Sequence, residues 1–444
     1  MNTPKYIKAS CIYLPRELDS FKRKKGNYLQ PIFEAVTNAW EAIMDKFGND
    51  NLNKGSIVIK LFAEKGLDFG NQSAYNIQKI TIEDNGIGLD EANLERLKNL
   101  RDPSKGHSNN GTGRIQYLFF FGSTNIESVS AAGKSKSKMV KVTLSMNSSF
   151  LVNNSIMRLD EEHDVEFQPS RTVVTFNNPL DEKESQSYGA LSAGVLKSDI
   201  VHHSLARLCD NREKLPKITI ERYLNNELED TQEIKVSDIP VPDKDEDVEV
   251  PYVAIRENKV VKTDKKESFR IRSFVVSESK MECNRLYLVS KGELGNTLPL
   301  DLLADKETVD GNRYMFLLSG EYLDARDSDD RGNINLMKES ELKKSISSEY
   351  KIFQDEEFVL KEHIVEEVNG KISTLYQVFE EKEREKDDKI QELQEMFLLD
   401  PNTVNAIRSK VRKQSTDADI LKLVYEGEME KIANMDASIK KAVK

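Results

Sequence analysis

The sequence predicts an α/β protein in which helices cover one face of a sheet and a helical region follows. Three observations carry this prediction. Helical and β-branched segments alternate over residues 31–180, strand-like segments return between residues 217 and 318, and helical spacing dominates from residue 340. A chain of 444 residues is too long for one ordinary core, so two or three domains are expected.

The first predicted helix begins at Pro31, because proline suits the first helical turn, where its missing N–H is not needed. Gly48 ends the periodic pattern. One stripe of this helix is apolar: Ile32, Phe33, Val36, Ala39, Trp40 and Ile43. A second stripe is polar: Glu34, Asn38, Glu41 and Asp45. Such a stripe indicates either an enclosed site or an ordinary solvent-facing surface.

Local patterns predict the elements that follow this helix. Residues 57–62 and 80–84 are rich in β-branched side chains, which is typical of buried strands. A helix is expected over residues 89–100, with Asp90 as its N-cap. The other expectations are a polar loop over 101–111, a buried helix over 112–121, strands over 125–131, 139–145 and 172–176, and a charged linker over 181–186.

A second α/β domain and a helical region are expected after the linker. The expected elements are a helix over 191–209, strands over 217–223, 269–277, 285–289 and 314–318, and an acidic surface excursion over 239–250. Further on, four apolar residues lie seven apart, which predicts a partly coiled-coil-like seam in a helical hairpin or dimer: Phe358, Val365, Ile372 and Phe379. The expected organisation is a strap (1–30), a first domain (31–182), a second domain (183–338) and a helical region (339–444).

Composition argues against several classes of protein. A formal net charge of −11 disfavours a general nucleic-acid binder, although short lysine-rich runs leave room for a local basic groove. Cys11, Cys209 and Cys283 are far apart, so neither a disulfide framework nor a zinc site is expected. No apolar run approaches the roughly 20 residues that a membrane span requires. A cytoplasmic protein is therefore expected.

Several polar residues in the first domain are suited to binding a nucleotide and its metal. Glu34 can orient and partly deprotonate a water molecule, and Asn38, one helical turn later, can offer an oxygen to Mg²⁺. Asp84 at a strand end can accept a hydrogen bond from the amino group of adenine. These three side chains together predict a hydrolytic nucleotide pocket.

Glycines supply the backbone that such a pocket needs. Gly86 and Gly88 lack a Cβ, so the chain there can approach a base closely. Gly111 and Gly113 stand directly before a helix whose amino end favours anions. Two simpler interpretations stay open: residues 84–86 could form a plain hairpin turn, and residues 111–113 could form an ordinary loop.

These motifs resemble those of the GHKL superfamily of ATPases, which includes the gyrase B subunit, MutL, MORC proteins, the ninety-kilodalton heat-shock chaperones and histidine kinases. The family's Glu-x-x-x-Asn-x-x-Asp-Ala motif is matched by Glu34, Asn38, Glu41 and Ala42, with Glu41 in place of Asp. Its Asp-x-Gly-x-Gly motif is matched in full by Asp84, Gly86 and Gly88. The resemblance implies a Bergerat-type sandwich that binds ATP and Mg²⁺, with Asn38 as the metal ligand.

The match to the rest of the family pattern is partial. The lid motif Gly-x-x-Gly-x-Gly corresponds to Gly111, Thr112, Gly113 and the following Arg114, but Ser108 stands where the first glycine belongs. Gly106 can take that role in a shifted loop. A Gly-Thr pair of the family corresponds to Arg171 and Thr172, and the resemblance implies that Thr172 helps Asp84 to hold adenine.

In the family a second, transducer-like domain contributes a cation to the γ-phosphate. Arg331 is the favoured candidate, ahead of Arg326 and Lys291. Histidine kinases carry Asn where this chain has Glu34, so hydrolysis is favoured over phosphotransfer.

The resemblance therefore implies an ATPase whose lid closure brings two subunits together and clamps them on a macromolecular partner, through the second domain and the helical region. Two alternatives stay open: an ATP-sensing scaffold or chaperone-like module with little turnover, and a histidine-kinase-type phosphotransferase. Relatives in the family handle either DNA or proteins, so the partner is not identified, and a role in DNA maintenance or antiviral defence follows by analogy alone.

Overall fold

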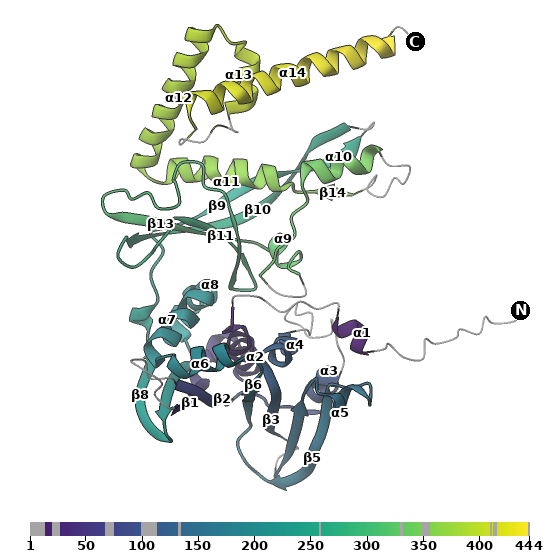
Figure 1. Cartoon of the computed structure of the whole chain (residues 1–444), viewed down its shortest axis with the longest axis vertical. Helices are drawn as coiled ribbons and strands as arrows, with labels where there is room; N and C mark the ends of the chain where they lie inside the picture. The colour runs from purple at the N-terminus through teal and green to yellow at the C-terminus, as the bar shows by residue number, and fades with distance from the viewer. Residues whose placement is uncertain are drawn as a thin grey trace, which may run out of the picture. The chain divides into compact units, whose positions relative to one another are not determined.

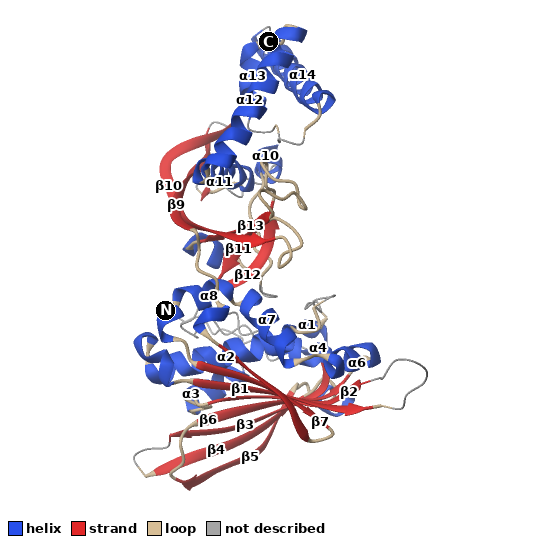
Figure 2. Ribbon diagram, turned by 90° about the vertical axis from the view of Figure 1, so that its left-hand side faces the viewer, coloured by secondary structure: helices blue, strands red, loops and turns tan. Residues whose placement is uncertain are grey.

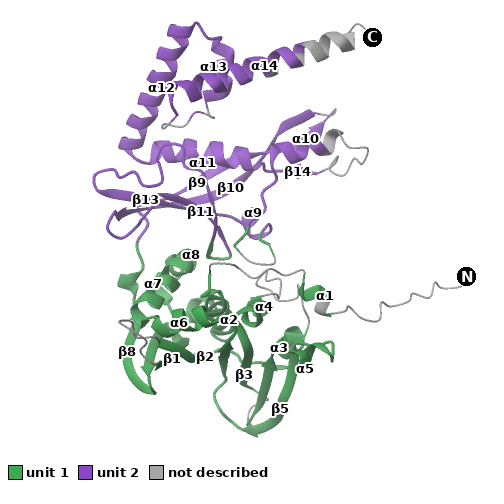
Figure 3. Cartoon of the chain, viewed as in Figure 1, with its two compact units in different colours: residues 1–240, 291–294, 327–333 green, residues 241–290, 295–326, 334–444 purple. Residues whose placement is uncertain are grey.

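The computed structural model describes residues 14–19, 27–66, 75–98, 113–131, 135–256, 259–328, 332–347, 356–408, 411 and 415–442. The chain splits into two compact units, shown in separate colours in Figure 3. Unit 1 comprises Met1–Pro240, Lys291–Leu294 and Asp327–Asn333. Unit 2 comprises Val241–Ser290, Gly295–Arg326 and Ile334–Lys444.

Within the described residues, unit 1 contains an eight-stranded sheet (Figure 1). In spatial order its strands are β5 (Met157–Glu166), β4 (Lys136–Leu144), β3 (Phe121–Ala131), β6 (Arg171–Pro179), β2 (Tyr75–Asp84), β1 (Ser56–Lys65), β7 (Lys217–Leu224) and β8 (Glu227–Ile234). Strands β1 to β6 pair antiparallel with their neighbours, whereas β7 joins β1 in parallel. The strands expected after the first helix are confirmed, and β5 is an addition to them.

Helices of unit 1 gather on one face of this sheet, as Figure 2 shows. They are α1 (Leu14–Leu18), α2 (Gln30–Phe47), α3 (Glu91–Lys98), α4 (Gly113–Phe120), α5 (Ser148–Leu151), α6 (Glu182–Ala190), α7 (Ala193–His203) and α8 (Leu205–Asp210). Buried residues alternate along β1, so Ile57, Ile59 and Leu61 face the helices in a continuous core. The expected sandwich with helices on one face is confirmed.

The boundary of unit 1 lies beyond the expected first domain. Strand β7 adds to the sheet beside β1, with Ile57 opposite Ile218, so the chain as far as Pro240 belongs to this unit. The charged linker expected at residues 181–186 is wrong, because helix α6 begins there. Asp181 caps it by accepting a hydrogen bond from the backbone N–H of Glu184 at 3.1 Å.

Unit 2 has a second sheet, six-stranded within the described residues. Its order is β12 (Glu293–Leu298), β11 (Arg285–Ser290), β13 (Asn312–Ser319), β10 (Lys259–Ser277), β9 (Lys244–Arg256) and β14 (Glu357–Phe358). The surface excursion expected over residues 239–250 is wrong in most of its length. Strand β9 runs there because Val248 and Val250 are buried, while Glu249 between them is exposed.

The helices of unit 2 are α9 (Glu321–Asp324), α10 (Glu339–Ser347), α11 (Lys361–Leu375), α12 (Gln377–Phe397), α13 (Pro401–Ile407) and α14 (Asp417–Ala442). The expected coiled-coil-like seam is wrong, because its residues pack against the second sheet and not against another helix alone. Ile372 and Phe379 join a core that also contains Phe269 and Phe316 from the second sheet. The seven-residue spacing therefore reflects helices packed on a sheet.

Among the described residues, no helix is long and apolar enough to cross a membrane. Cys209 and Cys283 are not joined to each other by a disulfide.

Candidate functional site

Helix α2 carries the polar stripe into the interior of unit 1. Pro31 lies in its first turn, and Gly48, with φ of 74°, caps its end, as the sequence predicts. Glu34 is only 1% exposed and Glu41 only 6% exposed. Buried carboxylates on a helix are rare unless they are paired or functional. The solvent-facing interpretation of this stripe is therefore excluded at these two positions.

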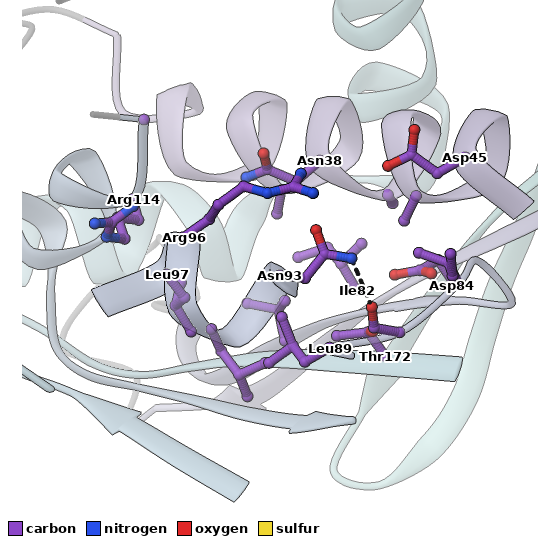
Figure 4. Close-up of a pocket in the computed structure, with 18 of the residues that line it drawn as sticks. Asn38, Asp45, Ile82, Asp84, Leu89, Asn93, Arg96, Leu97, Arg114 and Thr172 are labelled. Atoms are coloured by element: carbon purple, nitrogen blue, oxygen red, sulfur yellow. Dashed lines mark hydrogen bonds between the residues drawn. The ribbon is translucent and has the colours of Figure 1, made fainter. Parts of the chain in front are cut away.

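A cavity of about 170 Å³ lies between α2, α3, the amino end of α4 and the central strands of the sheet. Its lining residues are Ala35, Asn38, Ala39, Ala42, Asp45, Ile82, Asp84, Ile87, Gly88, Leu89, Asn93, Arg96, Leu97, Gly113, Arg114, Tyr117, Ile126, Thr172 and Val174. Figure 4 shows Asn38 and Asp45 on α2 facing Asn93, Asp84 and Thr172. Polar groups thus converge from several elements on a largely apolar hollow, which is typical of a small-molecule site.

Asp84 ends strand β2 and is almost wholly buried. Its Oδ1 accepts a hydrogen bond from the backbone N–H of Gly86 at 2.8 Å. Burial raises the pKa of the Asp84 carboxyl to about 7, against the smaller opposing effects of that hydrogen bond and of Lys46. A buried carboxyl with a perturbed pKa beside a cavity marks a candidate functional group.

Thr172 lies directly opposite Asp84, because these two residues are register partners in the antiparallel pair of β2 and β6. Its Oγ1 lies 3.0 Å from Oγ of Ser128 on β3. The Ser128 hydroxyl also accepts a hydrogen bond from the backbone N–H of Leu89 at 2.8 Å. This chain of hydroxyls fixes the floor of the cavity beside Asp84.

The turn after Asp84 fits tightly against α2. The backbone N–H of Ile87 donates to the carbonyl of Ala42 at 3.0 Å, which ties the turn to the helix. A Cβ at Gly86 would lie 2.5 Å from Cβ of Ala42. Gly88 has φ of +80°, a backbone conformation that favours glycine. The hairpin interpretation of residues 84–86 does not apply, since the chain continues from this turn into α3.

We expect Gly86→Ala to destabilise unit 1 by about 1–3 kcal/mol, because the new methyl group overlaps the α2 backbone at Ala42. Gly194→Ala in α7 is the matched control, since no atom lies within 4 Å of its Cβ position. That control should be neutral or stabilising by up to about 1 kcal/mol. Urea unfolding of both variants measures the difference. Equal stability of the two variants would contradict the tight contact.

Glu34 lies at the edge of the cavity, beside the first residue of α4. Its Oε1 accepts a hydrogen bond from Nε2 of Gln30 at 3.0 Å. A Cβ at Gly113 would lie 2.9 Å from Cδ of Glu34 and closer still to Oε2. Only glycine therefore lets the amino end of α4 come this close to the carboxylate. Gly113 and Arg114 both line the cavity, so Glu34 adjoins it there.

Asn38 lines the cavity next to Glu34 on the same helix. Its Nδ2 donates to Oη of Tyr117 at 2.9 Å, which holds the amide in place. This bond uses the nitrogen, and an amide oxygen is the type of ligand that Mg²⁺ accepts. Within the described chain, no group of three or more His, Cys, Asp or Glu side chains could hold a metal ion. A magnesium ion held mainly by phosphates and waters fits the Asn38 side chain without such a group.

The other predicted site residues fall into three sets. Ala42 lines the cavity, whereas Glu41 is buried in α2 and is not one of the lining residues. Lys291 belongs to unit 1, and Arg326 belongs to unit 2, where its guanidinium lies over the ring of Tyr322. The predictions that lie outside the described residues are those for Gly106, Gly111, Thr112 and Arg331.

The segment Lys291–Leu294 is fastened to α2 and α8 within unit 1. Glu293 is 6% exposed, and its Oε1 accepts hydrogen bonds from Oγ1 of Thr37 at 2.6 Å and from Arg207 at 3.1 Å. Arg207 also donates to the backbone carbonyl of Lys291 at 2.9 Å. A buried carboxylate paired with a partly buried guanidinium holds the Lys291 backbone against the helix that carries Glu34 and Asn38.

Several lining side chains have no role predicted from the sequence, among them Asn93, Arg96, Leu97 and Tyr117. Asn93 and Arg96 lie three residues apart on the predicted helix that follows Gly88, so both fall on one of its faces. That spacing, read next to the Asp84 motif, is the signal that could have indicated them. Asp45, which the sequence places on the polar stripe without a predicted role, also lines the cavity.

Comparisons with known proteins give little further information. The sequence matches no family model and no curated protein. Among solved structures, one match is described as the crystal structure of the N-terminal domain of a DNA repair protein. It aligns with a TM-score of 0.37 and 12% identity, over 68% of this chain and 91% of that chain. A similarity at this level does not assign a family, so the functional argument stands on the site itself.

Proposed function

We propose that this chain is a magnesium-dependent ATPase of the GHKL type, with a Bergerat-type fold in unit 1. In this proposal, ATP binding and hydrolysis drive lid closure and the clamping of a dimer on a macromolecular partner. A single observation carries it: one cavity is lined by Asn38, by Asp84 and by the amino end of α4, with Glu34 beside that helix end.

The proposed roles follow from the chemistry of each group. Asp84, with Thr172 opposite, accepts a hydrogen bond from the amino group of adenine. Asn38 offers its amide oxygen to Mg²⁺, and the ion neutralises charge on the phosphates. The backbone N–H groups at the start of α4 bind the phosphates, because the amino end of a helix attracts anions. Glu34 orients the attacking water.

Lys291 is a second candidate source of the cation for the γ-phosphate, beside Arg331. Its backbone is fixed by Arg207 against the helix that holds Glu34, whereas Arg326 lies on Tyr322 in the other unit. Arg331, the residue favoured by the family resemblance, lies outside the described residues. A fixed backbone with a long cationic side chain is suited to stabilising charge that develops during phosphoryl transfer.

Phosphate release and nucleotide affinity test the proposal directly. The full chain with Mg²⁺ should bind ATP, release phosphate at steady state and bind GTP more weakly. Guanine presents a carbonyl oxygen where adenine presents the amino group, so Asp84 would face an acceptor. Calorimetry and a coupled phosphate assay measure both quantities. Absence of ATP binding would end the proposal.

Two other outcomes would assign one of the alternatives. Tight ATP binding with negligible phosphate release would favour an ATP-sensing scaffold. Transfer of labelled γ-phosphate to protein would favour a phosphotransferase of the histidine-kinase type. A partner such as DNA would be revealed by a change in turnover when the partner is added.

A further inference from the structure

Helix α3 carries a charged side chain, Arg96, that faces the cavity. Arg96 is partly buried and lines the cavity, whereas Lys98 on the same helix is exposed and forms an ion pair with Glu95 at 2.9 Å. Among the residues that the structure describes, the guanidinium of Arg96 has no hydrogen-bond or ion-pair partner. A guanidinium that is partly removed from water needs acceptors for its N–H groups. A ligand in the cavity can supply them.

The first turn of α3 fixes the helix that presents Arg96. Oδ1 of Asp90 accepts a hydrogen bond from the backbone N–H of Asn93 at 2.7 Å, and the carbonyl of Asp90 accepts one from Leu94 at 2.8 Å. Nδ2 of Asn93 donates to the carbonyl of Gly88 at 3.3 Å, and the Leu94 side chain is buried. Because its helix is held in place, Arg96 loses less conformational freedom when it binds a ligand.

Helix α2 runs along the cavity and gives the order of the groups that line it. At one end, the turn after Asp84 is tied to the carbonyl of Ala42. At the other end, the first residue of α4, Gly113, lies against Glu34. Positions 42 and 34 are about 12 Å apart along the helix axis, at about 1.5 Å per residue. Asp84 therefore marks one end of the cavity and the amino end of α4 marks the other.

Arg96 lies between these two ends. Figure 4 shows its guanidinium at the level of Asn38 along the direction of α2, whereas Asp84 lies near the level of Asp45. Positions 38 and 45 are about 10 Å apart along the helix, a length that accommodates a base and a sugar. In the same view, Arg96 and Arg114 lie on one side of the cavity, and the two carboxylates lie on the other. The cavity thus offers acceptors at one end and guanidinium groups for an anion at the other.

We propose that Arg96 binds the first phosphates of the nucleotide and makes the cavity selective for nucleoside diphosphates and triphosphates over nucleosides. This inference rests on the proposed function for the identity of the base, and it adds a phosphate-binding residue to the same site. A guanidinium can donate two parallel hydrogen bonds to one phosphate, which a lysine cannot do. Glu34 lies one helical turn beyond Asn38, so the terminal phosphate reaches this carboxylate while Arg96 holds the phosphates before it.

Calorimetric titration of the full chain with Mg²⁺ and with adenosine, AMP, ADP or ATP tests this assignment. The natural chain should bind ADP and ATP more tightly than adenosine. Arg96→Gln should weaken the binding of ADP and ATP at least about tenfold, because charge-assisted hydrogen bonds to phosphate are lost. Its affinity for adenosine should equal that of the natural chain, which shows that the variant keeps the shape of the cavity.

Lys98→Gln is the matched control, because it removes the same charge from the same helix at a residue that does not line the cavity. It should leave the affinity for ATP within about twofold of the natural value. Arg96→Lys should recover part of the affinity that Arg96→Gln loses, since it keeps the charge without the paired hydrogen bonds. Equal losses in Arg96→Gln and Lys98→Gln would overturn the assignment, as would an equal loss of adenosine binding in Arg96→Gln.

Tripolyphosphate, which has no base, separates this inference from the proposed ATPase activity. The natural chain should bind it, and Arg96→Gln should bind it at least about tenfold more weakly. If ATP bound and was hydrolysed while Arg96→Gln kept the natural affinity for ADP and ATP, the role of Arg96 would be wrong and the ATPase would stand. If ATP failed to bind while tripolyphosphate bound through Arg96, the ATPase would be wrong and the anion-binding role of Arg96 would stand.

Discussion

Glu34→Gln should release phosphate between about 100-fold and 10,000-fold more slowly than the natural chain, while ATP affinity changes little. The substitution removes the negative charge that activates water and keeps the shape of the side chain. The amide oxygen of glutamine can still accept the hydrogen bond that Gln30 donates to Glu34. The contact with Gly113 is also preserved, so the fold should not change.

Single-turnover phosphate release and equilibrium nucleotide binding measure the two effects separately. Glu182→Gln, an exposed residue at the start of α6, is the control for loss of one carboxylate in the same unit. It should keep full turnover. If Glu34→Gln hydrolysed ATP at the natural rate, Glu34 would not be the group that activates water.

Asp84→Asn should abolish measurable ATP binding and at the same time stabilise unit 1. The amino group of an asparagine cannot accept a hydrogen bond from adenine, so the polar contact to the base is lost. The Asn oxygen can still accept from the backbone N–H of Gly86, as Asp84 does now. Opposite effects on binding and on stability are expected where a residue is kept for function.

The gain in stability depends on pH in a defined direction. Burial raises the pKa of Asp84 to about 7 in the folded chain, from 3.8 as its ordinary value. Between these two values the folded state binds one proton more than the unfolded state, so the free energy of unfolding falls as pH rises. At about 1.4 kcal/mol per pKa unit, burial of the ionised Asp84 carboxylate lowers the free energy of unfolding by about 4 kcal/mol above pH 7. This loss disappears near pH 4.

Urea unfolding of Asp84→Asn and of the natural chain at pH 5 and pH 8 measures their difference in the free energy of unfolding. The variant should gain more stability at pH 8. ATP affinity of the natural chain should fall as pH drops below about 7, because a neutral carboxyl is a weaker hydrogen-bond acceptor than a carboxylate and one of its two oxygens then carries a proton. Asp90→Asn is the control, since asparagine also caps a helix and Asp90 does not line the cavity. Unchanged ATP affinity in Asp84→Asn would remove the adenine contact from the proposal.

Local pattern was enough to predict the elements that surround the cavity. Pro31 and Gly48 bound α2, because proline and glycine act through their own backbone geometry. The β-branched runs predicted β1 and β2, since a buried strand needs such residues wherever it lies in a sheet. Asp90 was predicted as the cap of α3, and Asn93 N–H does donate to its Oδ1 at 2.7 Å.

Elements whose identity depends on a distant partner could not be predicted in this way. Strand β5 is acidic and mostly exposed, and it forms because β4 offers an unpaired edge. Strand β7 was predicted, but its place beside β1 was not, because a strand pattern does not name its neighbour. The apolar spacing of α11 is compatible both with a coiled coil and with a helix that packs on a sheet, so the spacing alone could not distinguish them.

The sequence by itself determined that Glu34, Asn38 and Asp84 belong to segments of the right type, because helix caps, strand ends and glycine turns are local properties. Only the tertiary structure decided that Asn38 and Asp84 line one cavity, that Gly113 must lack a side chain beside Glu34, and that Glu293 fastens Lys291 near the same helix. These contacts depend on close packing between segments far apart in the chain, and no local pattern encodes the distance between such segments.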